Sequence, residues 1–455
     1  MSFAAGSFRD PAARVLADDG PQIRRVLSAA AAADDTRLRA AGLFDELERA
    51  GWLIASRRRD DVPAPDGWSA VVESPRLPFV SYPAEWSFGM LRDAALLTLQ
   101  ITERALERGA ILKDASAFNV LFEGAQPRFV DVSSLMSRDG DGPWHAYGQF
   151  CDHFLAPLML EAYRGVPFQS WLRGSLEGLD IGTLARLLSA RDLVRPGVAT
   201  HVMARTALER RSGTLAPAAR HAARGLALPA AALLRNVRSL QRLVAGLRSR
   251  AVSPWADYRD AEDHALSARK AAFVAAAGAR LGGGQLAWDV GANSGRYSRL
   301  LAEHYAYIVA LDADAGAIDR LYAELRGSDE ARRVLPMVVD VMQPSPPRGW
   351  RGRERASLVE RGRPQLALYL ALIHHLCLGR GVPLAEFLDF ARDTAPAAVI
   401  EFVAAEDPHS QALLASRTAQ HPGYDLANFR RLAAARFQIL DEAALTPTRQ
   451  LFLLA

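Results

Sequence analysis

The sequence predicts an α/β protein, with a mostly parallel, doubly wound sheet in roughly its last 200 residues. Short buried apolar runs alternate there with amphipathic stretches of helical spacing, which is the pattern of consecutive βαβ units. The final twenty residues break this rhythm, because two apolar runs flank a turn-rich connection containing Pro447, as in a terminal hairpin. The expected strands are 286–290, 307–311, 335–339, 366–372 and 398–403, the expected helices 297–304 and 315–325, and the expected hairpin strands 437–440 and 451–454.

The composition is that of an ordinary globular chain. Of 455 residues, 50% are hydrophobic and 23% are charged, which excludes wholesale disorder and a collagen-like repeat. Cys151 and Cys377 lie far apart and satisfy no metal-ligand spacing, so we expect neither a disulfide nor a metal site, and a reducing cytoplasm fits. The N-terminus lacks the apolar core of a signal peptide, and no long uncharged apolar stretch occurs, so we expect a cytoplasmic protein without a membrane span.

We expect three parts: an α+β domain over 1–165, a basic helical connector over 166–254 and the α/β domain over 255–455. Between Arg205 and Arg250, ten arginines face a single acid, although the net charge of the whole chain is only +4. The stretch contains a helix-spaced apolar stripe, which packs on a neighbouring domain in one interpretation and leaves the arginines to contact a polyanion or membrane surface in the other. The stripe consists of Leu233, Val237, Leu240, Val244 and Leu247.

A glycine-containing turn follows the first strand of the α/β domain. It reads Asp289-Val-Gly291-Ala-Asn293-Ser-Gly295 and stands where the strand passes into a helix. Glycine suits this place because a ligand can approach backbone that carries no Cβ atom, and because a tight turn can require positive φ. Asp312 ends the second strand, where a carboxylate can accept hydrogen bonds from ribose hydroxyls, and Asp340 ends the third, where it can meet an adenine edge.

These residues resemble the class I S-adenosylmethionine-dependent methyltransferases. The family has an acid and a glycine-rich turn after the first strand, and an acid closing the second, here Asp289 to Gly295 and Asp312. The resemblance implies S-adenosylmethionine as cofactor and a Rossmann-like seven-stranded sheet whose terminal hairpin supplies the antiparallel strand. The run 370–376, together with Trp255, Tyr258 and Lys270, resembles a bacterial group of nodulation-protein-like methyltransferases. A dinucleotide-binding enzyme is disfavoured, because the third glycine of G-x-G-x-x-G is missing.

Methyl transfer from a sulfonium needs mainly alignment of the acceptor, so a general base is optional. If the acceptor must lose a proton, His374 or His375 at the end of the fourth strand is the candidate base; the alternative is that this pair only caps the strand. Glu401 and Asp407 either line the acceptor pocket or are surface charges. The Asn-Pro-Pro-Tyr-like motif of many amino-directed enzymes is absent, which leaves the acceptor atom undetermined.

A second constellation lies in the N-terminal part. Asp114 and Asn119 precede a short hairpin, with strands expected at 120–122 and 128–130, and Asp131 follows it. Kinases use an Asp, an Asn and a later Asp at similar spacing as base and magnesium ligands. The segment 75–165 therefore resembles a kinase C-lobe, in which a helical pattern over 91–108 precedes the Asp114 motif as expected. No Gly-rich loop precedes it, and Lys113 is the first lysine of the chain.

The leading hypothesis is methyl transfer by the C-terminal domain, with the degenerate kinase-like domain recognising the acceptor. The alternatives are a nucleic-acid-binding protein or RNA methyltransferase that uses the arginine-rich connector, a kinase-like phosphotransferase, and a pseudo-enzyme. A nucleic-acid-binding connector would place aromatic side chains beside the basic ones, and none occurs between Arg205 and Arg250. Asp114, Asn119 and Asp131 remain candidates for a metal or a polar ligand.

Overall fold

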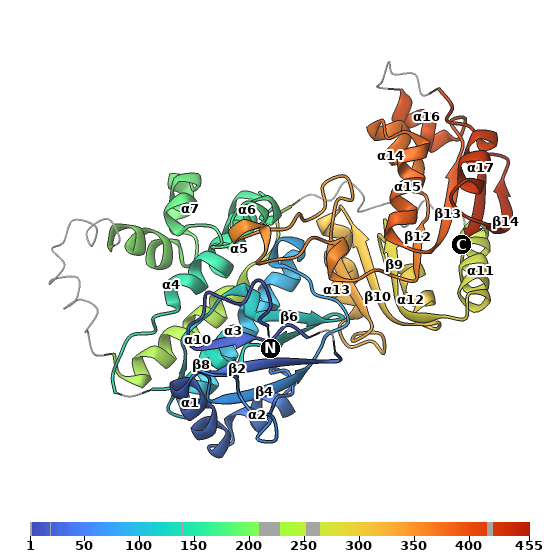
Figure 1. Cartoon of the computed structure of the whole chain (residues 1–455). Helices are drawn as coiled ribbons and strands as arrows, with labels where there is room; N and C mark the ends of the chain where they lie inside the picture. The colour runs from blue at the N-terminus through green and yellow to red at the C-terminus, as the bar shows by residue number, and fades with distance from the viewer. Residues whose placement is uncertain (1, 19, 139, 209–227, 252–263, 416–421) are drawn as a thin grey trace. The chain divides into compact units, whose positions relative to one another are not determined.

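A computed structural model of the full chain describes residues 2–18, 20–138, 140–208, 228–251, 264–415 and 422–455. The chain divides into two compact units (Figure 1). The N-terminal unit comprises Met1–Phe122, Pro127–Val252 and Pro346–Ala356, and the C-terminal unit comprises Glu123–Gln126, Ser253–Ser345 and Ser357–Ala455. The finer division into three parts at 165 and 254 stays a prediction.

The C-terminal unit is built on a seven-stranded sheet with the order β11-β10-β9-β12-β13-β15-β14. The first five strands in this order are parallel, and β15 runs antiparallel to both β13 and β14. The mixed α/β fold is confirmed, and every expected strand position is occupied. The strands are β9 (Gly284–Val290), β10 (Tyr305–Asp312), β11 (Val334–Val338), β12 (Leu366–Tyr369), β13 (Ala397–Val403), β14 (Ile439–Thr446) and β15 (Arg449–Leu454).

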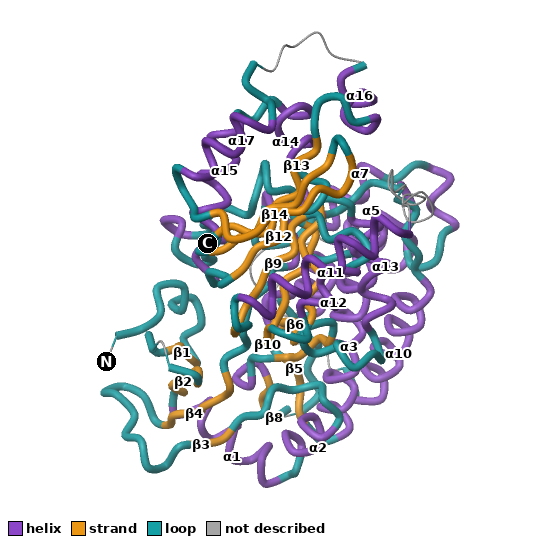
Figure 2. Tube along the Cα trace, turned by 90° about the vertical axis from the view of Figure 1, so that its right-hand side faces the viewer, coloured by secondary structure: helices purple, strands orange, loops and turns teal. Residues whose placement is uncertain are grey.

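Helices pack along both sides of this sheet, with α14, α15 and α17 on one side and α11, α12 and α13 on the other (Figure 2). Continuous buried runs such as β13, in which every residue is buried, are what a strand covered on both faces requires. The helices are α11 (His264–Arg280), α12 (Arg296–Leu301), α13 (Ala315–Leu325), α14 (Ile373–Arg380), α15 (Leu384–Thr394), α16 (Pro408–Leu414) and α17 (Leu426–Ala434), with a short 3-10 turn at η9 (Val359–Arg361).

The expectation for the fourth strand was wrong at its end. The strand stops at Tyr369 rather than Leu372, and a helix, α14, begins at Ile373. The apolar run continues through this change, but Ala371 has a φ of +48°, which no strand contains. His374 and His375 therefore lie in the first turn of α14 and not at a strand end.

The N-terminal unit is α+β. An antiparallel sheet of order β1-β2-β4-β3 is followed by helix α3, and two small strand pairs, β5 with β8 and β6 with β7, come after it. The helix and the hairpin expected around residues 91–130 are confirmed. The strands are β1 (Ala13–Val15), β2 (Gln22–Leu27), β3 (Arg57–Arg58), β4 (Ala70–Pro75), β5 (Ala110–Leu112), β6 (Val120–Glu123), β7 (Gln126–Phe129) and β8 (Leu135–Ser137).

Helices make up the rest of the N-terminal unit. The α-helices are α1 (Ala29–Ala40), α2 (Leu43–Arg49), α3 (Phe88–Glu107), α4 (Tyr147–Phe150), α5 (Ala156–Arg164), α6 (Gln169–Gly174), α7 (Ile181–Leu187) and α10 (Ala230–Gly246). Short 3-10 or π segments are η1 (Pro83–Glu85), η2 (Ala117–Asn119), η3 (Val132–Ser134), η4 (Cys151–Leu155), η5 (Ala190–Val194), η6 (Val198–Met203) and η8 (Trp350–Gly352). No helix in the described ranges combines the length and the apolar character needed to cross a bilayer.

Helix α10 is the amphipathic helix expected in the basic connector. Its apolar stripe is buried, and the helix packs on α3. Arg238 pairs with Glu103 and Glu107 of α3, with nitrogen-to-oxygen distances of 2.6 and 3.0 Å. These contacts match the packing interpretation of the stripe. Four of the connector's other arginines, Arg210, Arg211, Arg220 and Arg224, lie outside the described residues.

Candidate functional site

A cavity of about 400 Å³ in the C-terminal unit lies at the carboxyl ends of its parallel strands. Five of the predicted site residues line it: Gly291, Asn293, Asp312, Asp340 and His375. Asp289, Gly295 and His374 were predicted with them but are not on its wall. The remaining wall residues are Val290, Ala313, Ala317, Val339, Val341, Leu370, Ala371, Leu372, Leu376, Gly379, Arg380 and Leu413.

The turn after β9 has left-handed backbone at three of its positions. The φ angles are +83° at Gly291, +45° at Asn293 and +69° at Gly295. Asn is one of the few residues with a side chain that visits this region regularly, which is why it can stand where glycine is commoner. The Gly291 N–H donates to the Leu311 carbonyl oxygen at 2.8 Å and so ties the turn to β10.

Gly295 is needed for packing rather than for the cavity. A Cβ atom at this position would lie 2.4 Å from the Leu321 Cδ1 of helix α13, and the positive φ adds strain for any other residue. Gly295 also precedes the first residue of α12. It lets helix α12 start close against its neighbour, so its contribution to the site is indirect.

Asp312 joins the glycine turn to the cavity. One carboxylate oxygen accepts the Asn293 N–H at 2.9 Å, and the other accepts the Asp314 N–H at 2.8 Å. Burial raises the pKa of this carboxyl group above its usual range, although these backbone donors oppose the shift. Because each carboxylate oxygen has a second lone pair, Asp312 can hold the turn and still accept hydrogen bonds from a ligand in the cavity.

Asp289 lies behind the wall. Its side chain is buried, and one oxygen accepts the Ser298 Oγ–H of helix α12 at 2.6 Å. Burial raises the pKa of Asp289 to about 6, the Ser298 hydrogen bond opposes this, and the nearby Asp312 adds to it. Asp289 therefore links β9 to α12 inside the unit and does not line the cavity.

Asp340 comes two residues after β11 ends and meets a cation that sequence reasoning missed. Its Oδ2 lies 2.9 Å from the Nη2 of Arg380 at the end of α14, and its Oδ1 accepts the Met342 N–H at 3.0 Å. The Arg380 side chain is 54% exposed. Both residues line the cavity, so this ion pair forms part of its polar wall.

The two predicted histidines have different surroundings although their rings lie only 4.3 Å apart. His374 is buried, and its Nδ1 has no hydrogen-bond partner among the described residues. Burial, helped by His375, lowers the pKa of His374 to about 3. His375 lines the cavity, and burial together with His409 lowers its pKa below the usual range. A catalytic role for either residue stays a prediction.

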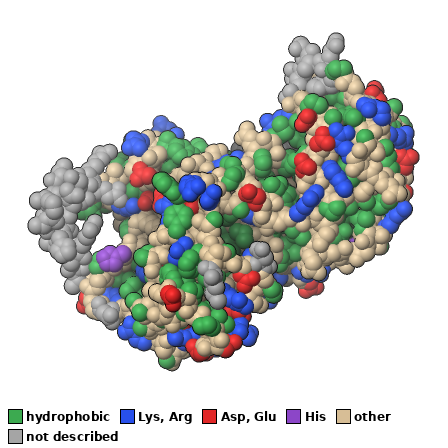
Figure 3. Space-filling model, in the orientation of Figure 1, with side chains coloured by type: hydrophobic (Ala, Val, Ile, Leu, Met, Phe, Trp, Pro, Cys, Tyr) green, Lys and Arg blue, Asp and Glu red, His purple; other side chains and the backbone are tan. Residues whose placement is uncertain are grey.

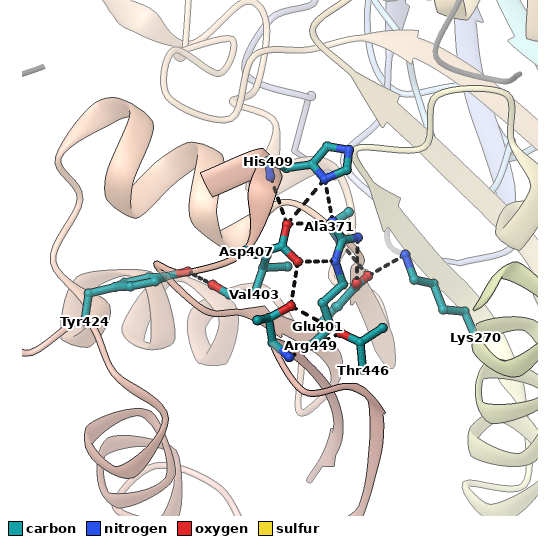
Figure 4. A network of polar contacts seen from close by, with 10 residues as sticks. Lys270, Ala371, Glu401, Val403, Asp407, His409, Tyr424, Thr446 and Arg449 are labelled. Carbon is teal, nitrogen blue, oxygen red and sulfur yellow. Dashed lines mark hydrogen bonds and ion pairs between the residues drawn. The ribbon is translucent and has the colours of Figure 1, made fainter. Parts of the chain in front are cut away.

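Glu401 and Asp407 belong to a buried network of charges, shown in Figure 4, and neither is a surface charge. One Glu401 oxygen lies 3.0 Å from Lys270 Nζ, and the same oxygen accepts the Ala371 N–H at 2.9 Å. The other oxygen is 3.5 Å from Arg449 Nη1. Of the residues that carry the resemblance to nodulation-protein-like enzymes, Lys270 is therefore a buried partner of Glu401, whereas Trp255 and Tyr258 lie outside the described residues.

Arg449 connects the two carboxylates of this network. Its guanidinium donates to both oxygens of Asp407, at 2.8 and 3.0 Å, and its Nη2 donates to His409 Nδ1 at 2.8 Å. Burial acts to raise the pKa of Asp407, but Arg449 and the other donors hold it well below its usual range. Arg449 was missed because it sits on a terminal strand, far along the chain from the carboxylates that it joins, and His409 was missed with it.

In the N-terminal unit, the Asp131 carboxylate is occupied by donors of the chain itself. Its Oδ1 accepts from Arg25 Nη1 at 2.7 Å and from Ser133 Oγ at 2.6 Å, and its Oδ2 accepts from Ser134 Oγ at 2.5 Å. Asn119 donates to the same Ser134 hydroxyl at 3.2 Å. Burial favours a raised pKa for Asp131, but Arg25 and the serines lower it below its usual range.

Asp114 lies near this group, and no ion pair joins it to a cation among the described residues. Its Oδ1 accepts the Ser116 N–H at 2.9 Å, and its backbone oxygen accepts from the Asn119 side chain at 3.4 Å. Burial raises its pKa, and the Asp131 charge contributes. In the part of the chain that the structure describes, no three His, Cys, Asp or Glu side chains are grouped as metal ligands.

Comparison with known proteins decides the family. No protein-family model matches the chain. The nodulation protein NoeA of Rhizobium meliloti (strain 1021) is 31% identical over an alignment of 451 residues that covers 96% of this chain and 92% of NoeA. The chain belongs to the NoeA family. The predicted place in a nodulation-protein-like group is thus confirmed, and the match to NoeA spans both units of the chain.

Three solved methyltransferases align with part of the chain at low scores. The N-methyltransferase NodS of Bradyrhizobium japonicum WM9 is 10% identical and covers 42% of this chain and 97% of its own, with a TM-score of 0.31. The magnesium protoporphyrin IX methyltransferase ChlM of Synechocystis PCC 6803 is 15% identical, covering 44% and 88%, with a TM-score of 0.31. The bifunctional kinase-methyltransferase WbdD is 16% identical, covering 44% and 41%, with a TM-score of 0.30.

Proposed function

We propose that the C-terminal unit binds S-adenosylmethionine in the cavity at its strand ends and transfers the methyl group to an acceptor. One observation carries the proposal: a left-handed glycine turn and the Asp312 carboxylate meet on the wall of one cavity. Both come from the residues that resemble class I methyltransferases. The strand order, with an antiparallel terminal hairpin beside five parallel strands, is also the order that this resemblance implies.

The wall suits the proposed cofactor. A cavity of about 400 Å³ lies within the roughly 300 to 1,000 Å³ usual for small-molecule sites. Asp312 offers carboxylate lone pairs for ribose hydroxyls, and Gly291 exposes backbone without a Cβ atom. Apolar side chains, among them Val339 and Leu372, offer a surface for a flat heterocycle. When bound, the cofactor supplies a methyl group on a good leaving group, so the residues of the chain act mainly by alignment and by excluding water.

His375 is the better of the two candidate bases. It lines the cavity, whereas His374 does not. His374, with a pKa of about 3, binds a proton too weakly to take one from an acceptor near neutral pH. His375 has a lowered pKa and is therefore neutral at pH 7, with a ring nitrogen able to accept a proton if the acceptor must lose one.

For the N-terminal unit we propose acceptor recognition without phosphoryl transfer. The pairing of the Asp131 carboxylate with Arg25 and with the hydroxyls of Ser133 and Ser134 supports this, because a carboxylate whose charge is already balanced by a cation attracts a magnesium ion less strongly. The acceptor remains a small molecule or macromolecule of unassigned chemistry. A nucleic-acid acceptor is less favoured, since Arg238 is paired with acids and since, on the face shown in Figure 3, basic and acidic side chains are interspersed. The free, buried thiols of Cys151 and Cys377 fit a cytoplasmic location.

Calorimetric titration of the full chain with S-adenosylmethionine and S-adenosylhomocysteine tests the cofactor. We expect a micromolar Kd that rises at least about 100-fold in Asp312→Ala, which loses the ribose acceptor and the support of the Asn293 amide. Glu324→Ala, which removes an exposed carboxylate of the same unit, is the matched control and should bind like the native chain. A folded native chain that gives no heat with either compound would refute the proposal.

A further inference from the structure

The wall of the cavity contains strained backbone beside the glycine turn. Ala371 has a φ of +48°, a left-handed conformation that is unfavourable for an alanine. It stands directly between β12 and α14, with Leu370 and Leu372 beside it, and all three residues line the cavity. Strain of this kind persists only where the surrounding structure enforces it.

The enforcing contact comes from the neighbouring strand. Glu401 of β13 accepts the Ala371 N–H at 2.9 Å, and β13 pairs in parallel with β12 up to Tyr369 opposite Ile400. Glu401 is fully buried and does not itself line the cavity. Its carboxylate thus contacts the Ala371 backbone on the side that faces the interior of the unit and not on the side that faces the cavity.

Two cations hold this carboxylate in place. Lys270 Nζ lies 3.0 Å from the oxygen that also accepts the Ala371 N–H, and Arg449 lies 3.5 Å from the other oxygen (Figure 4). Asp407 neutralises Arg449 from its far side, so the buried group balances two cations against two carboxylates. Buried ion pairs are seldom more stabilising than apolar residues of the same volume, so a geometric role better accounts for this one.

The left-handed turn lies beside the glycine turn, because β12 and β9, the strands that precede these turns, are neighbours in the sheet. A Cβ atom on Gly291 would lie 3.6 Å from Leu372 Cδ1, which is ordinary van der Waals contact, so Leu372 packs close to the glycine turn. A shift of the backbone at Ala371 would therefore move Leu372 relative to Gly291. His375, in the first turn of α14, would move with it.

We propose that Glu401 is a positioning residue of the cofactor site, which holds Ala371 in its left-handed conformation and so sets the distance between Leu372 and the glycine turn. The inference rests on the proposed function, because it takes the cavity as the cofactor site. Lys270 is the first partner that fixes Glu401, and Arg449 is the second. None of the three lines the cavity.

The test compares binding of S-adenosylhomocysteine by the full chain in four forms: native, Lys270→Met/Glu401→Leu, Ala371→Gly, and the three changes combined. The double variant removes the buried cation and carboxylate together and leaves Arg449 paired with Asp407. We expect its Kd to rise at least 10-fold. Glycine adopts positive φ without strain, so adding Ala371→Gly should recover at least threefold of this loss, which a general loss of stability would not do.

Tyr424→Phe is the matched control. It removes the hydrogen bond from the Tyr424 hydroxyl to the Val403 carbonyl oxygen, at the end of the same strand, and should leave the Kd within twofold of native. If the double variant does not fold, Glu401→Gln with and without Ala371→Gly gives the same comparison. We expect Glu401→Gln to raise the Kd for S-adenosylhomocysteine about threefold, and the added Ala371→Gly to remove this rise.

The outcomes separate the two proposals. Binding by the double variant within twofold of native would overturn the role of Glu401 and leave the proposed function standing. A loss that Ala371→Gly does not reduce would also overturn it, because the effect would not pass through the backbone of residue 371. No binding by the native chain would overturn the proposed function itself, and the positioning role with it.

Discussion

Asp312 and Asp131 illustrate two fates of the same sequence signal. Each is an acid at or just after the end of a strand and stands at a spacing that a ligand-binding family uses. Asp312 is held by backbone amides and lines a cavity. Asp131 is held by two serine hydroxyls and by the guanidinium of Arg25. The difference teaches that the donors around a carboxylate, more than its position in a motif, decide whether a ligand can use it.

The contrast has an electrostatic basis. Backbone amides leave the charge of Asp312 unbalanced, and burial raises its pKa, so a polar ligand that donates hydrogen bonds would relieve an existing cost. Asp131 already has a cation, and its pKa is lowered. A cationic ligand at Asp131 would have to compete with Arg25, and nothing in the sequence near Asp131 reveals an arginine 106 residues earlier.

The largest expected effect is a loss of stability when the ion pair between Arg25 and Asp131 is removed. Arg25→Ala removes the cation from a carboxylate whose side chain is only 14% exposed, which typically costs about 3 kcal/mol of unfolding free energy. We expect denaturant unfolding of the N-terminal unit to show this loss, while the Kd for S-adenosylhomocysteine stays within twofold of native. Arg37→Ala, at an exposed pair with Asp34, is the control and should cost under about 0.5 kcal/mol. An Arg25 variant as stable as native would mean that Asp131 is not closed by this pair.

The next effect is a change in the stability of the C-terminal unit when the buried Asp289 is replaced. The pKa of Asp289 is raised to about 6 in the folded chain, so the folded state bears the cost of ionising it at neutral pH. Asp289→Asn should therefore stabilise the C-terminal unit by up to about 3 kcal/mol above pH 6, and its amide oxygen can still accept from Ser298. The gain should shrink as the pH falls from 6 towards 3.8, where native Asp289 becomes protonated in both states.

Thermal unfolding at pH 7.5 and at pH 4.5 measures this difference. A variant less stable than native at both pH values would show that the charged form is needed by the fold. Asp312→Asn offers a comparison, because that carboxylate takes two backbone donors that an amide cannot match equally, and it should destabilise the unit rather than stabilise it.

The sequence predicted the sheet well and the end of its fourth strand badly, for one physical reason. Buried parallel strands are apolar throughout, so runs such as 398–403 are plain in the sequence. The run 366–372 is equally apolar, yet the backbone leaves the strand at Leu370 because Glu401, thirty residues later, holds Ala371 left-handed. Local patterns do not report a contact of that range.

The residues of the cavity also divide into those that the local sequence places and those that long-range packing places. Gly291, Asn293 and Asp312 could be predicted because each lies at the junction of a strand and the following turn, where position in the chain fixes position at the sheet edge. Arg380 and Leu413 lie on helices, and only the packing of α14 against α16 brings them to the cavity. Arg449 reaches its partners from the terminal hairpin.

A smaller effect compares one buried histidine in each unit. Burial lowers the pKa of His374 to about 3 and that of His153 to about 4, from 6.5 when unfolded. The unfolded chain thus binds protons first as the pH falls, and each group removes about 2 kcal/mol of stability between pH 7.5 and pH 5. His374→Leu should flatten this decline for the C-terminal unit, and His153→Leu for the N-terminal unit.

The two variants should differ at pH 7.5. His153 Nδ1 accepts the Ala117 N–H at 3.3 Å, so its loss leaves a buried donor without a partner. His374 Nδ1 has no partner among the described residues, so His374→Leu should cost little or even stabilise. Urea unfolding at pH 7.5 and pH 5 measures the free energy of unfolding of each variant at each pH. If the stability of His374→Leu fell with pH in parallel with that of the native chain, the buried neutral state of the His374 ring would be contradicted.

The smallest expected effect is a change in ligand affinity when the Asp340–Arg380 ion pair of the cavity wall is altered. Asp340 is predicted to meet the adenine edge, yet its carboxylate is paired with Arg380, whose side chain is 54% exposed. Exposed pairs contribute about 0.2 to 1 kcal/mol, so a ligand can compete for Asp340 at small cost, unlike at Asp131. If it does, Arg380→Ala should tighten S-adenosylhomocysteine binding by up to about threefold, while Asp340→Ala weakens it by a similar factor. Equal weakening by both variants would instead mean that the ion pair acts as a unit, closing the cavity wall rather than offering a carboxylate to the ligand.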